Sequence, residues 1–407
     1  MSFYKLTIRD VPLDNKTVLV RADYNVPLTK DGEISDDLRI RASLPTIEYL
    51  LGRGCKIVIM SHLGRPEGRD GSLSLEPIAQ RLAHLLRKDV RFVDECIGDK
   101  VFQAVKRAPE NSIIVLENLR FHKEEEANDA DFAKKIADAS GARYFVQDGF
   151  GVVHRAHAST SAITGYIPSV SGILLEKEYV TITSAMESPK RPLIAVIGGA
   201  KIKDKIPLIE RFIDIADRII IGGALANTFL AKSGVSVGLS KVETDEYNVI
   251  DRIYSSVKDK KGDIAETFML LPSDLAVGKS LTTDAERQNV VLGDVQSDDY
   301  VLDMGSQTIE EIVEIAESAG TVIWNGTLGY AELPEFAEGS ARLASSLSGN
   351  KNITSIIGGG DTADFVLKWI EKNDGSFTHV STGGGASLEL MSGIKLPGIE
   401  SLLDAKG

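Results

Sequence analysis

The sequence predicts an α/β protein of two lobes, each a parallel sheet wrapped by helices in a Rossmann-like arrangement, joined by a helical hinge. Short apolar runs recur along the chain with helical segments between them, and this rhythm is typical of parallel α/β sheets. The runs are continuously apolar rather than alternating, as in strands that are covered on both faces. The 407 residues are too many for one core of ordinary size, so two domains are expected.

The apolar runs give the expected strands in order. In the first half they are residues 18–20, 57–60, 113–116 and 144–146. After Lys190 they are residues 193–197, 219–221, 268–271, 300–302, 322–324, 353–357 and 378–380. Helices are expected over residues 174–186, 312–319 and 361–370. Another helix should begin near Lys203 or Asp204, because the fixed φ of Pro207 suits a first helical turn.

The boundary between the lobes is expected near residues 170–190. Residues 166–172 form a break that contains proline, serine and glycine, and residues 188–192 form a second break with two prolines. One helical segment between two breaks indicates a connector between domains. The expected division is therefore a first lobe over residues 1–172, a connecting helix over 173–189 and a second lobe from residue 190 on.

The bulk composition excludes several classes of function. A net charge of −13 argues against general binding to nucleic acid or anionic membranes, so an anionic substrate needs a locally basic site. The two cysteines, Cys55 and Cys96, are too few for a disulfide framework and fit a reducing compartment. No signal-peptide pattern or membrane-spanning apolar stretch occurs. We expect a cytoplasmic protein that binds neither nucleic acid nor membrane.

Basic and other polar side chains follow several strands of the first half. They are Arg21, Asp23 and Asn25 after the first run, His62 and Arg65 after the second, Arg120 after the third, and His154 and Arg155 after the fourth, with Arg39 from segment 36–41 as a further candidate. In open α/β sheets, ligands bind outside the carboxyl ends of the strands. Guanidinium groups bind carboxylate and phosphate in bidentate fashion. A small molecule that carries both groups suits this set, although Asp23 and Asn25 alone also fit turn formers.

The turn after the run 193–197 has the chemistry of a phosphate site. Residues 198–205 read Gly-Gly-Ala-Lys-Ile-Lys-Asp-Lys and place Lys201 and Lys205 between a strand and a helix start. Backbone N–H groups, the helix dipole and two ammonium groups would face one point. The turn is neither a Walker A loop nor a dinucleotide fingerprint. An ordinary βα turn with surface lysines is the alternative at this stage.

The other strand ends of the second half are rich in glycine, notably residues 358–360 and 383–385. Glycine lets a phosphate or a flat ring approach the backbone. Asp361 suits Mg²⁺ beside a nucleotide phosphate, but it also suits a helix N-cap. Glu332 could accept a hydrogen bond from a ribose hydroxyl, or it could be an ordinary surface residue.

The acidic run 123–126 is expected to be a solvated helix start rather than a site. A basic pocket on one lobe and a glycine-rich cradle on the other indicate phosphoryl transfer after closure.

These motifs resemble the phosphoglycerate kinase family over essentially the whole chain. The matching segments are Val-Arg-Ala-Asp-Tyr-Asn-Val-Pro at 20–27, Ser-His-Leu-Gly-Arg-Pro at 61–66, Leu-Glu-Asn-Leu-Arg-Phe-His at 116–122, and the segments 150–160, 198–206, 324–329, 358–362 and 382–387. The resemblance implies reversible phosphoryl transfer between ATP and the carboxylate of 3-phosphoglycerate, with Mg²⁺ and with 1,3-bisphosphoglycerate and ADP as products. The family is usually monomeric, so a monomer is expected.

The resemblance assigns roles residue by residue. Asp23, Asn25, Arg39, His62, Arg65, Arg120 and Arg155 would hold the phosphoglycerate, and Lys201, Lys205, Asn325, Glu332, Gly359, Gly360, Asp361 and Thr362 would hold the nucleotide. Asp361 would contact the Mg²⁺ of the nucleotide. Arg39 and Lys205 would be the catalytic pair that meets at the transferred phosphoryl group after hinge closure. The segment of about 386–407 is expected to pack back on the first, phosphoglycerate-binding lobe, with residues 190–385 forming the nucleotide-binding lobe.

No general base is needed, because the accepting carboxylate is already ionised at neutral pH; charge stabilisation and in-line positioning remain. The chain departs from common family patterns at Val301, Ser306 and Thr327 on the expected adenosine side, which leaves the preferred nucleotide base open. A non-catalytic nucleotide-binding relative is the main alternative, but the charged residues that the chemistry needs are present. A kinase with another carboxylate substrate fits the arginine and histidine set less well. A hydride-transfer enzyme lacks its dinucleotide fingerprint.

Overall fold

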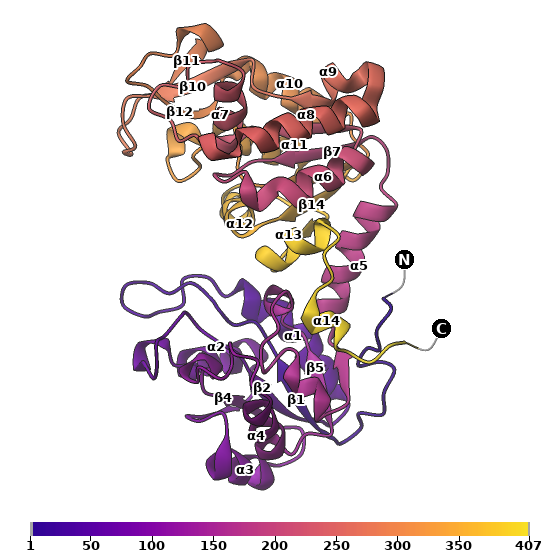
Figure 1. Ribbon diagram of the computed structural model, residues 1–407. Coiled ribbons are helices and arrows are strands. Elements are labelled where there is room, and N and C mark those ends of the chain that lie inside the picture. The colour runs from indigo at the N-terminus through magenta and orange to yellow at the C-terminus, as the bar shows by residue number, and fades with distance from the viewer. Residues whose placement is uncertain (1–2, 406–407) are drawn as a thin grey trace. The chain divides into compact units, whose positions relative to one another are not determined.

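The computed structural model describes residues 3–405 and divides into two compact units (Figure 1). The first unit holds the described residues up to Val180 and those from Lys395 on, and the second holds Thr181–Ile394. The division falls within helix α5, Ile173–Glu187, which occupies the segment expected to connect the lobes. The limits of the units thus differ from the expected lobes 1–172 and 190–385 by several residues.

The first unit is built on one parallel sheet with strand order β3-β4-β2-β1-β5-β6. Its strands are β1 Thr17–Arg21, β2 Lys56–Met60, β3 Val90–Val93, β4 Ile113–Leu116, β5 Tyr144–Gln147 and β6 Ser169–Ser171. The helices that accompany them are α1 Leu38–Gly52, α2 Glu76–Leu86, α3 Gly98–Arg107, α4 Ala130–Ser140 and the short α14 Pro397–Glu400. Because β1 lies between β2 and β5 and all run parallel, the segments after these strands emerge at one edge of the sheet.

The second unit has a parallel sheet of order β15-β14-β13-β7-β8-β9. Its strands are β7 Leu193–Ile197, β8 Arg218–Ile221, β9 Met269–Leu270, β13 Thr321–Asn325, β14 Thr354–Gly358 and β15 His379–Val380. Its helices are α6 Ile206–Ile215, α7 Gly223–Lys232, α8 Tyr247–Lys261, α9 Ala265–Phe268, α10 Ser306–Glu317, α11 Glu338–Leu347, α12 Gly360–Asn373 and α13 Gly385–Met391. The central strands β7 and β13 bring the glycine turn after residue 197 beside Asn325.

A small antiparallel sheet in the second unit corrects one expectation. The expected strand 300–302 is β12, Tyr300–Met304, but it pairs in antiparallel fashion with β10, Asp274–Gly278, whose other neighbour is β11, Gln288–Val291. It therefore lies outside the parallel sheet. The expected strand 268–271 is shorter in the structure, where β9 covers only Met269–Leu270, because Phe268 is the last residue of α9.

Four strands, β3, β6, β10 and β11, were not expected from the sequence, and their residues explain why. β11 is largely exposed, β3 is mostly partly exposed and carries Arg91, and β6 reads Ser-Val-Ser within the expected break at 166–172. β10 is buried, but its apolar run is only residues 275–277, between Asp274 and Gly278. The other expected strands and helices are present, and α6 begins at Ile206 after a 3₁₀ turn over Lys203–Lys205.

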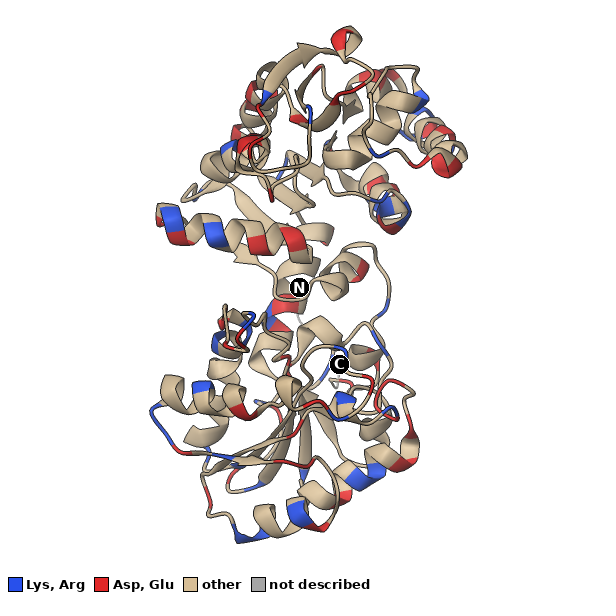
Figure 2. Cartoon of the chain, turned by 90° about the vertical axis from the view of Figure 1, so that its left-hand side faces the viewer, with Lys and Arg blue, Asp and Glu red and all other residues tan. Residues whose placement is uncertain are grey.

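Figure 2 shows charged residues mainly on helices and loops, with the sheets largely free of them. Within residues 3–405, none of the helices combines the length and apolarity of a membrane span.

The end of the chain packs on its beginning in the first unit. Residues from Lys395 on belong to that unit, whereas α13 belongs to the second; this differs from the expected start of the returning segment near 386. The ammonium group of Lys5 is buried and donates to Glu400 O at 2.9 Å, Leu402 O at 3.1 Å and the Asp404 carboxylate at 2.6 Å. One buried cation thus satisfies three acceptors of the returning segment.

Replacing Lys5 by methionine should loosen this contact, because a hydrogen bond to a charged group contributes about 1.5–3 kcal/mol. The backbone N–H of Leu6 donates to Leu403 O at 2.8 Å and reports on the same contact. We expect its hydrogen exchange to become at least about tenfold faster in Lys5→Met. The exposed Lys16 offers a control, since Lys16→Met should leave that exchange unchanged. Equal protection of Leu6 in both variants would contradict this account.

Candidate active site

An ion pair at the end of β1 begins the basic site of the first unit. Arg39, from the first turn of α1, contacts the Asp23 carboxylate at 2.7 Å. Burial favours the neutral form of Asp23, but Arg39, with Arg21 and the backbone N–H of Asn25, holds its pKa at about 2. Asp23 is therefore a fixed negative charge that orders the cations around it.

The segment after β2 is tied to the segments after β1 and β4. The backbone N–H of Gly64 donates to Asn25 Oδ1 at 2.8 Å, and Gly64 O accepts from Arg120 Nη1 at 2.7 Å. Burial lowers the pKa of Arg120, Glu126 opposes that change, and Arg155 and Arg65 lower it further. Arg65, Arg120 and Arg155 follow β2, β4 and β5, which run parallel in one sheet, so the three arginines lie at the same edge of that sheet.

His62 lies at the buried side of this basic group. Its pKa lies well below the ordinary value, because burial and the nearby Arg21, Arg120 and Arg39 disfavour the imidazolium, and Asp23 opposes them only in part. His62 is therefore neutral at pH 7. The neighbouring Arg155 is exposed, and its Nε lies 3.2 Å from His154 Nε2.

The structure thus brings together all seven residues that the sequence assigned to phosphoglycerate. They are Asp23, Asn25, Arg39, His62, Arg65, Arg120 and Arg155. Arg65 and Arg155 are exposed and His62 is buried, so the group has an open face and a fixed interior. A compact molecule with more than one anionic group fits such a surface.

The acidic run 123–126 differs from its expected role. Helix α4 begins only at Ala130, and Glu125 is fully buried rather than solvated. Its carboxylate accepts from Ser159 Oγ at 2.5 Å and from the Ser159 backbone N–H at 3.0 Å. No pattern in the sequence indicates this contact, since Glu125 lies among three other charged residues and Ser159 is distant along the chain.

A cavity of about 340 Å³ in the second unit holds most of the predicted nucleotide residues. Its lining includes Lys201, Lys205, Asn325, Gly359, Gly360, Asp361 and Thr362. These residues come from the turn after β7, the end of β13 and the start of α12. Thr362 Oγ1 accepts from the Gly326 N–H at 2.7 Å and so joins two of these segments.

Lys205 is not an ordinary surface lysine. Burial lowers its pKa to about 8, against the opposing charges of Asp204 and Asp361. Its ammonium group donates to Asn325 Oδ1. The amide nitrogen of Asn325 is buried in this cavity, and it has no hydrogen-bond partner among the described residues. A buried unpaired donor beside a cation suits an anionic ligand atom.

The N-terminus of α12 closes the cavity. Gly359 has a φ of 91°, which favours glycine, and a Cβ there would lie 3.2 Å from Asn325 Nδ2. Gly359 occupies the N-cap position, and no side chain caps the helix. Asp361 therefore lies in the first turn rather than acting as the N-cap, and the N–H groups of this turn face the cavity region with the positive end of the helix dipole.

A second cavity of about 480 Å³ shares Asp361 and Thr327 with the first and is lined by Glu332. Of the three departures from family patterns, Val301 and Thr327 line it, whereas Ser306 does not. Ser306 instead accepts a hydrogen bond from Asn289 Nδ2 at 2.8 Å, beside the small sheet. Val301 and Thr327 therefore lie at this cavity and Ser306 lies beside the small sheet, and their place on the adenosine side stays a prediction.

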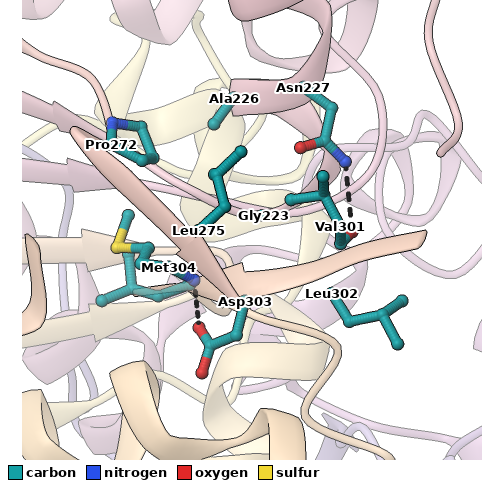
Figure 3. Close-up of a pocket in the computed structure, with 10 residues that line it drawn as sticks. Gly223, Ala226, Asn227, Pro272, Leu275, Val301, Leu302, Asp303 and Met304 are labelled. Carbon is teal, nitrogen blue, oxygen red and sulfur yellow. Dashed lines mark hydrogen bonds between the residues drawn. The ribbon is translucent and has the colours of Figure 1, made fainter. Parts of the chain in front are cut away.

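The wall beside this cavity is set by β12 and α7 (Figure 3). Asn227 Nδ2 donates to Val301 O at 3.3 Å, and Figure 3 shows the Asn227 amide directed at this strand. Asp303 accepts from the Met304 N–H at 2.9 Å and from Arg287 at 2.8 Å. Asn227 and Lys241 also line the cavity. The sequence did not single out either residue, since Asn227 lies inside helix α7 and Lys241 in a loop, away from the strand ends.

Comparison with known proteins identifies the family. A profile of the family described as Phosphoglycerate kinase matches residues 8–394. The chain belongs to the phosphoglycerate kinase family. Phosphoglycerate kinases of Dictyoglomus turgidum and Pseudothermotoga lettingae are 45% and 43% identical over 399 and 404 residues, which cover 98% and 99% of both chains.

Solved structures agree with this assignment. Phosphoglycerate kinase from Coxiella burnetii superposes with a TM-score of 0.83 at 33% identity, and that from Pyrococcus horikoshii with 0.82 at 30% identity. Each comparison covers 98% of both chains. The predictions of the phosphoglycerate kinase family, of its α/β fold with two sheets and of a kinase that acts on a carboxyl group are confirmed.

The pKa of Lys205 predicts how nucleotide binding depends on pH. The charged ammonium favours a phosphate ligand, and its population falls as pH rises through about 8. We expect the dissociation constant for ADP to rise above pH 8, by at most about tenfold per pH unit. In Lys205→Arg the guanidinium stays charged, so this rise should vanish. Calorimetric titration with ADP from pH 7 to about 9.5 measures both proteins; the same rise in both would exclude Lys205 as its source.

Proposed function

We propose that this chain interconverts ATP plus 3-phosphoglycerate and ADP plus 1,3-bisphosphoglycerate, with phosphoglycerate bound at the basic site of the first unit and nucleotide at the cavities of the second. The observation that supports this assignment most is the gathering of six predicted ligands after β1, β2, β4 and β5, with Arg39 from α1 beside them, in a chain of net charge −13. An acidic protein that concentrates arginines at one sheet edge has a site for an anion there.

The chemistry asks for positive charge and position rather than for a base. The accepting carboxylate of 3-phosphoglycerate is ionised at neutral pH. His62 is neutral and buried, and the mechanism assigns it only the role of a hydrogen-bond donor. Arg39 and Lys205 supply charge for the equatorial oxygens of the moving phosphoryl group. That they act on one phosphoryl group, after closure of the hinge, stays a prediction.

Mg²⁺ fits this site only together with the nucleotide. Within residues 3–405 there is no cluster of three or more acidic, histidine or cysteine side chains able to hold a metal alone. Asp361 supplies one carboxylate at the nucleotide cavity, and Mg²⁺ commonly binds one or two carboxylates plus phosphate oxygens. When bound, the ion neutralises phosphate charge.

We further propose that the protein is cytoplasmic and monomeric, and that it binds neither nucleic acid nor membrane.

The decisive experiment is Mg·ATP-dependent phosphorylation of 3-phosphoglycerate, followed by coupled reduction of the product. Wild type should be active. Lys205→Ala should lose turnover by at least about a hundredfold while ADP affinity falls much less, because the contact strengthens on the moving phosphoryl group. Lys203→Ala is the control, since Lys203 is exposed and does not line the cavity. Wild type that binds nucleotide without turnover would favour a non-catalytic relative, and equal losses in turnover and affinity would remove Lys205 from the transition state.

Arg65→Ala tests the assignment of the first unit. Losing a charge-assisted hydrogen bond costs about 1.5–3 kcal/mol, so the KM for 3-phosphoglycerate should rise about 10–150-fold. The KM for ATP should stay within about twofold. Arg91→Ala, at an exposed arginine of β3, should change neither constant. Steady-state kinetics with each substrate varied in turn gives the answer, and a selective ATP defect in Arg65→Ala would reverse the assignment of the two units.

A further inference from the structure

Glu125 is a buried carboxylate that lies behind the predicted phosphoglycerate residues and belongs to none of the predicted roles. It is fully buried in the turn before α4. Both of its oxygens accept hydrogen bonds from Ser159, Oε1 from the hydroxyl and Oε2 from the backbone N–H. Two accepting oxygens suit the ionised form. A buried ionised group requires a cation nearby, since an isolated buried charge is strongly unfavourable.

Arg21 is that cation. Its side chain is fully buried, and its Nη2 lies 3.9 Å from Glu125 Oε1. Its Nε donates to Ser159 Oγ at 2.7 Å, and its Nη1 donates to Ala22 O. Burial lowers the pKa of Arg21, and Glu125 is the largest opposing influence. Glu125 and Ser159 therefore hold the guanidinium in one orientation.

The remaining contact of Arg21 fixes His62. Arg21 Nη2 lies 3.2 Å from His62 Nδ1. A guanidinium has donors and no acceptor, so Nδ1 must accept this hydrogen bond. The neutral ring then carries its proton on Nε2. The directions of the other bonds agree, because Ser159 Oγ accepts from Arg21 and so gives its own proton to Glu125.

We propose that Glu125 is a positioning residue, which through Ser159 and Arg21 holds His62 as the Nε2–H tautomer and so presents a hydrogen-bond donor to an anionic oxygen of the substrate. This inference deepens the proposed function and rests on it for the identity of the substrate. In the alternative tautomer the proton is on Nδ1, and the lone pair of Nε2 would face the anionic oxygen and repel it. His157, whose Nδ1 lies 3.9 Å from Glu125 Oε1 and whose pKa burial and Arg21 lower to about 4, is neutral and does not replace Arg21.

Wild-type protein tests the tautomer without any substitution. Nitrogen-15 spectra of the histidine rings should show His62 with a protonated Nε2 and an unprotonated Nδ1 between about pH 6 and pH 8, assigned by the loss of its signals in His62→Gln. This readout needs no activity, so it separates the inference from the proposed function. A His62 that carries its proton on Nδ1, or that titrates within this range, would overturn the inference.

Glu125→Gln tests the positioning role with nearly the same shape. We expect the His62 signals to shift toward a mixture of tautomers, and the KM for 3-phosphoglycerate to rise about tenfold with the KM for ATP within about twofold. Ser159→Ala interrupts the same chain of hydrogen bonds without changing charge and should act alike. Glu124→Gln, the same substitution one residue earlier and partly exposed, should change neither readout.

Other outcomes are equally informative. Unchanged His62 signals and an unchanged KM in both Glu125→Gln and Ser159→Ala would show that Glu125 is only a structural counterion. If one variant does not fold, the other and the wild-type spectra still decide. Wild type with the predicted tautomer but without phosphoglycerate kinase activity would leave the positioning role intact and reject the proposed function instead.

Discussion

The basic site of the first unit depends on buried carboxylates that offset the repulsion between arginines at one edge of its sheet. Arg65, Arg120, Arg155 and the buried His62 lie where β2, β4 and β5 end, and burial together with the nearby Arg21, Arg120 and Arg39 keeps the pKa of His62 low. Asp23 and Glu125 offset that repulsion from within the protein. Because these carboxylates and their hydrogen bonds are buried or nearly so, the basic side chains are ordered before any ligand arrives, which is the preorganisation that charge stabilisation requires.

The second unit provides its anion-binding cavity mainly with backbone N–H groups rather than with charged side chains. A single partly buried lysine, an unpaired amide of Asn325 and the start of α12 surround one cavity. Gly359 has a φ of 91° and no Cβ, so the backbone at the start of α12 can lie close to the Asn325 side chain. The N–H groups and the dipole of a helix bind an anion without burying a full charge, so this half needs few counterions.

Sequence reasoning predicted what local patterns encode and missed what tertiary packing creates. The buried strands β1, β7 and β13 have continuous apolar runs, so both sheets and the strand-end ligands followed from them. β11 is exposed and β6 carries two serines, and neither has such a run. The antiparallel pairing of β12 depends on partners that its own residues do not specify. Glu125 was misjudged for the same reason, because its burial is decided by Ser159 and Arg21, distant in sequence.

The central claim is that each unit binds its own substrate, with phosphoglycerate at the arginine group and nucleotide at the glycine-lined cavity. Amide chemical-shift mapping of the labelled full chain tests this claim most directly, with 3-phosphoglycerate and ADP titrated separately. The account predicts that 3-phosphoglycerate first shifts the amides of Gly64 and Arg120, and that ADP first shifts those of Gly359 and Gly360. Shifts of Gly359 and Gly360 by 3-phosphoglycerate alone, with Gly64 and Arg120 unaffected, would contradict it.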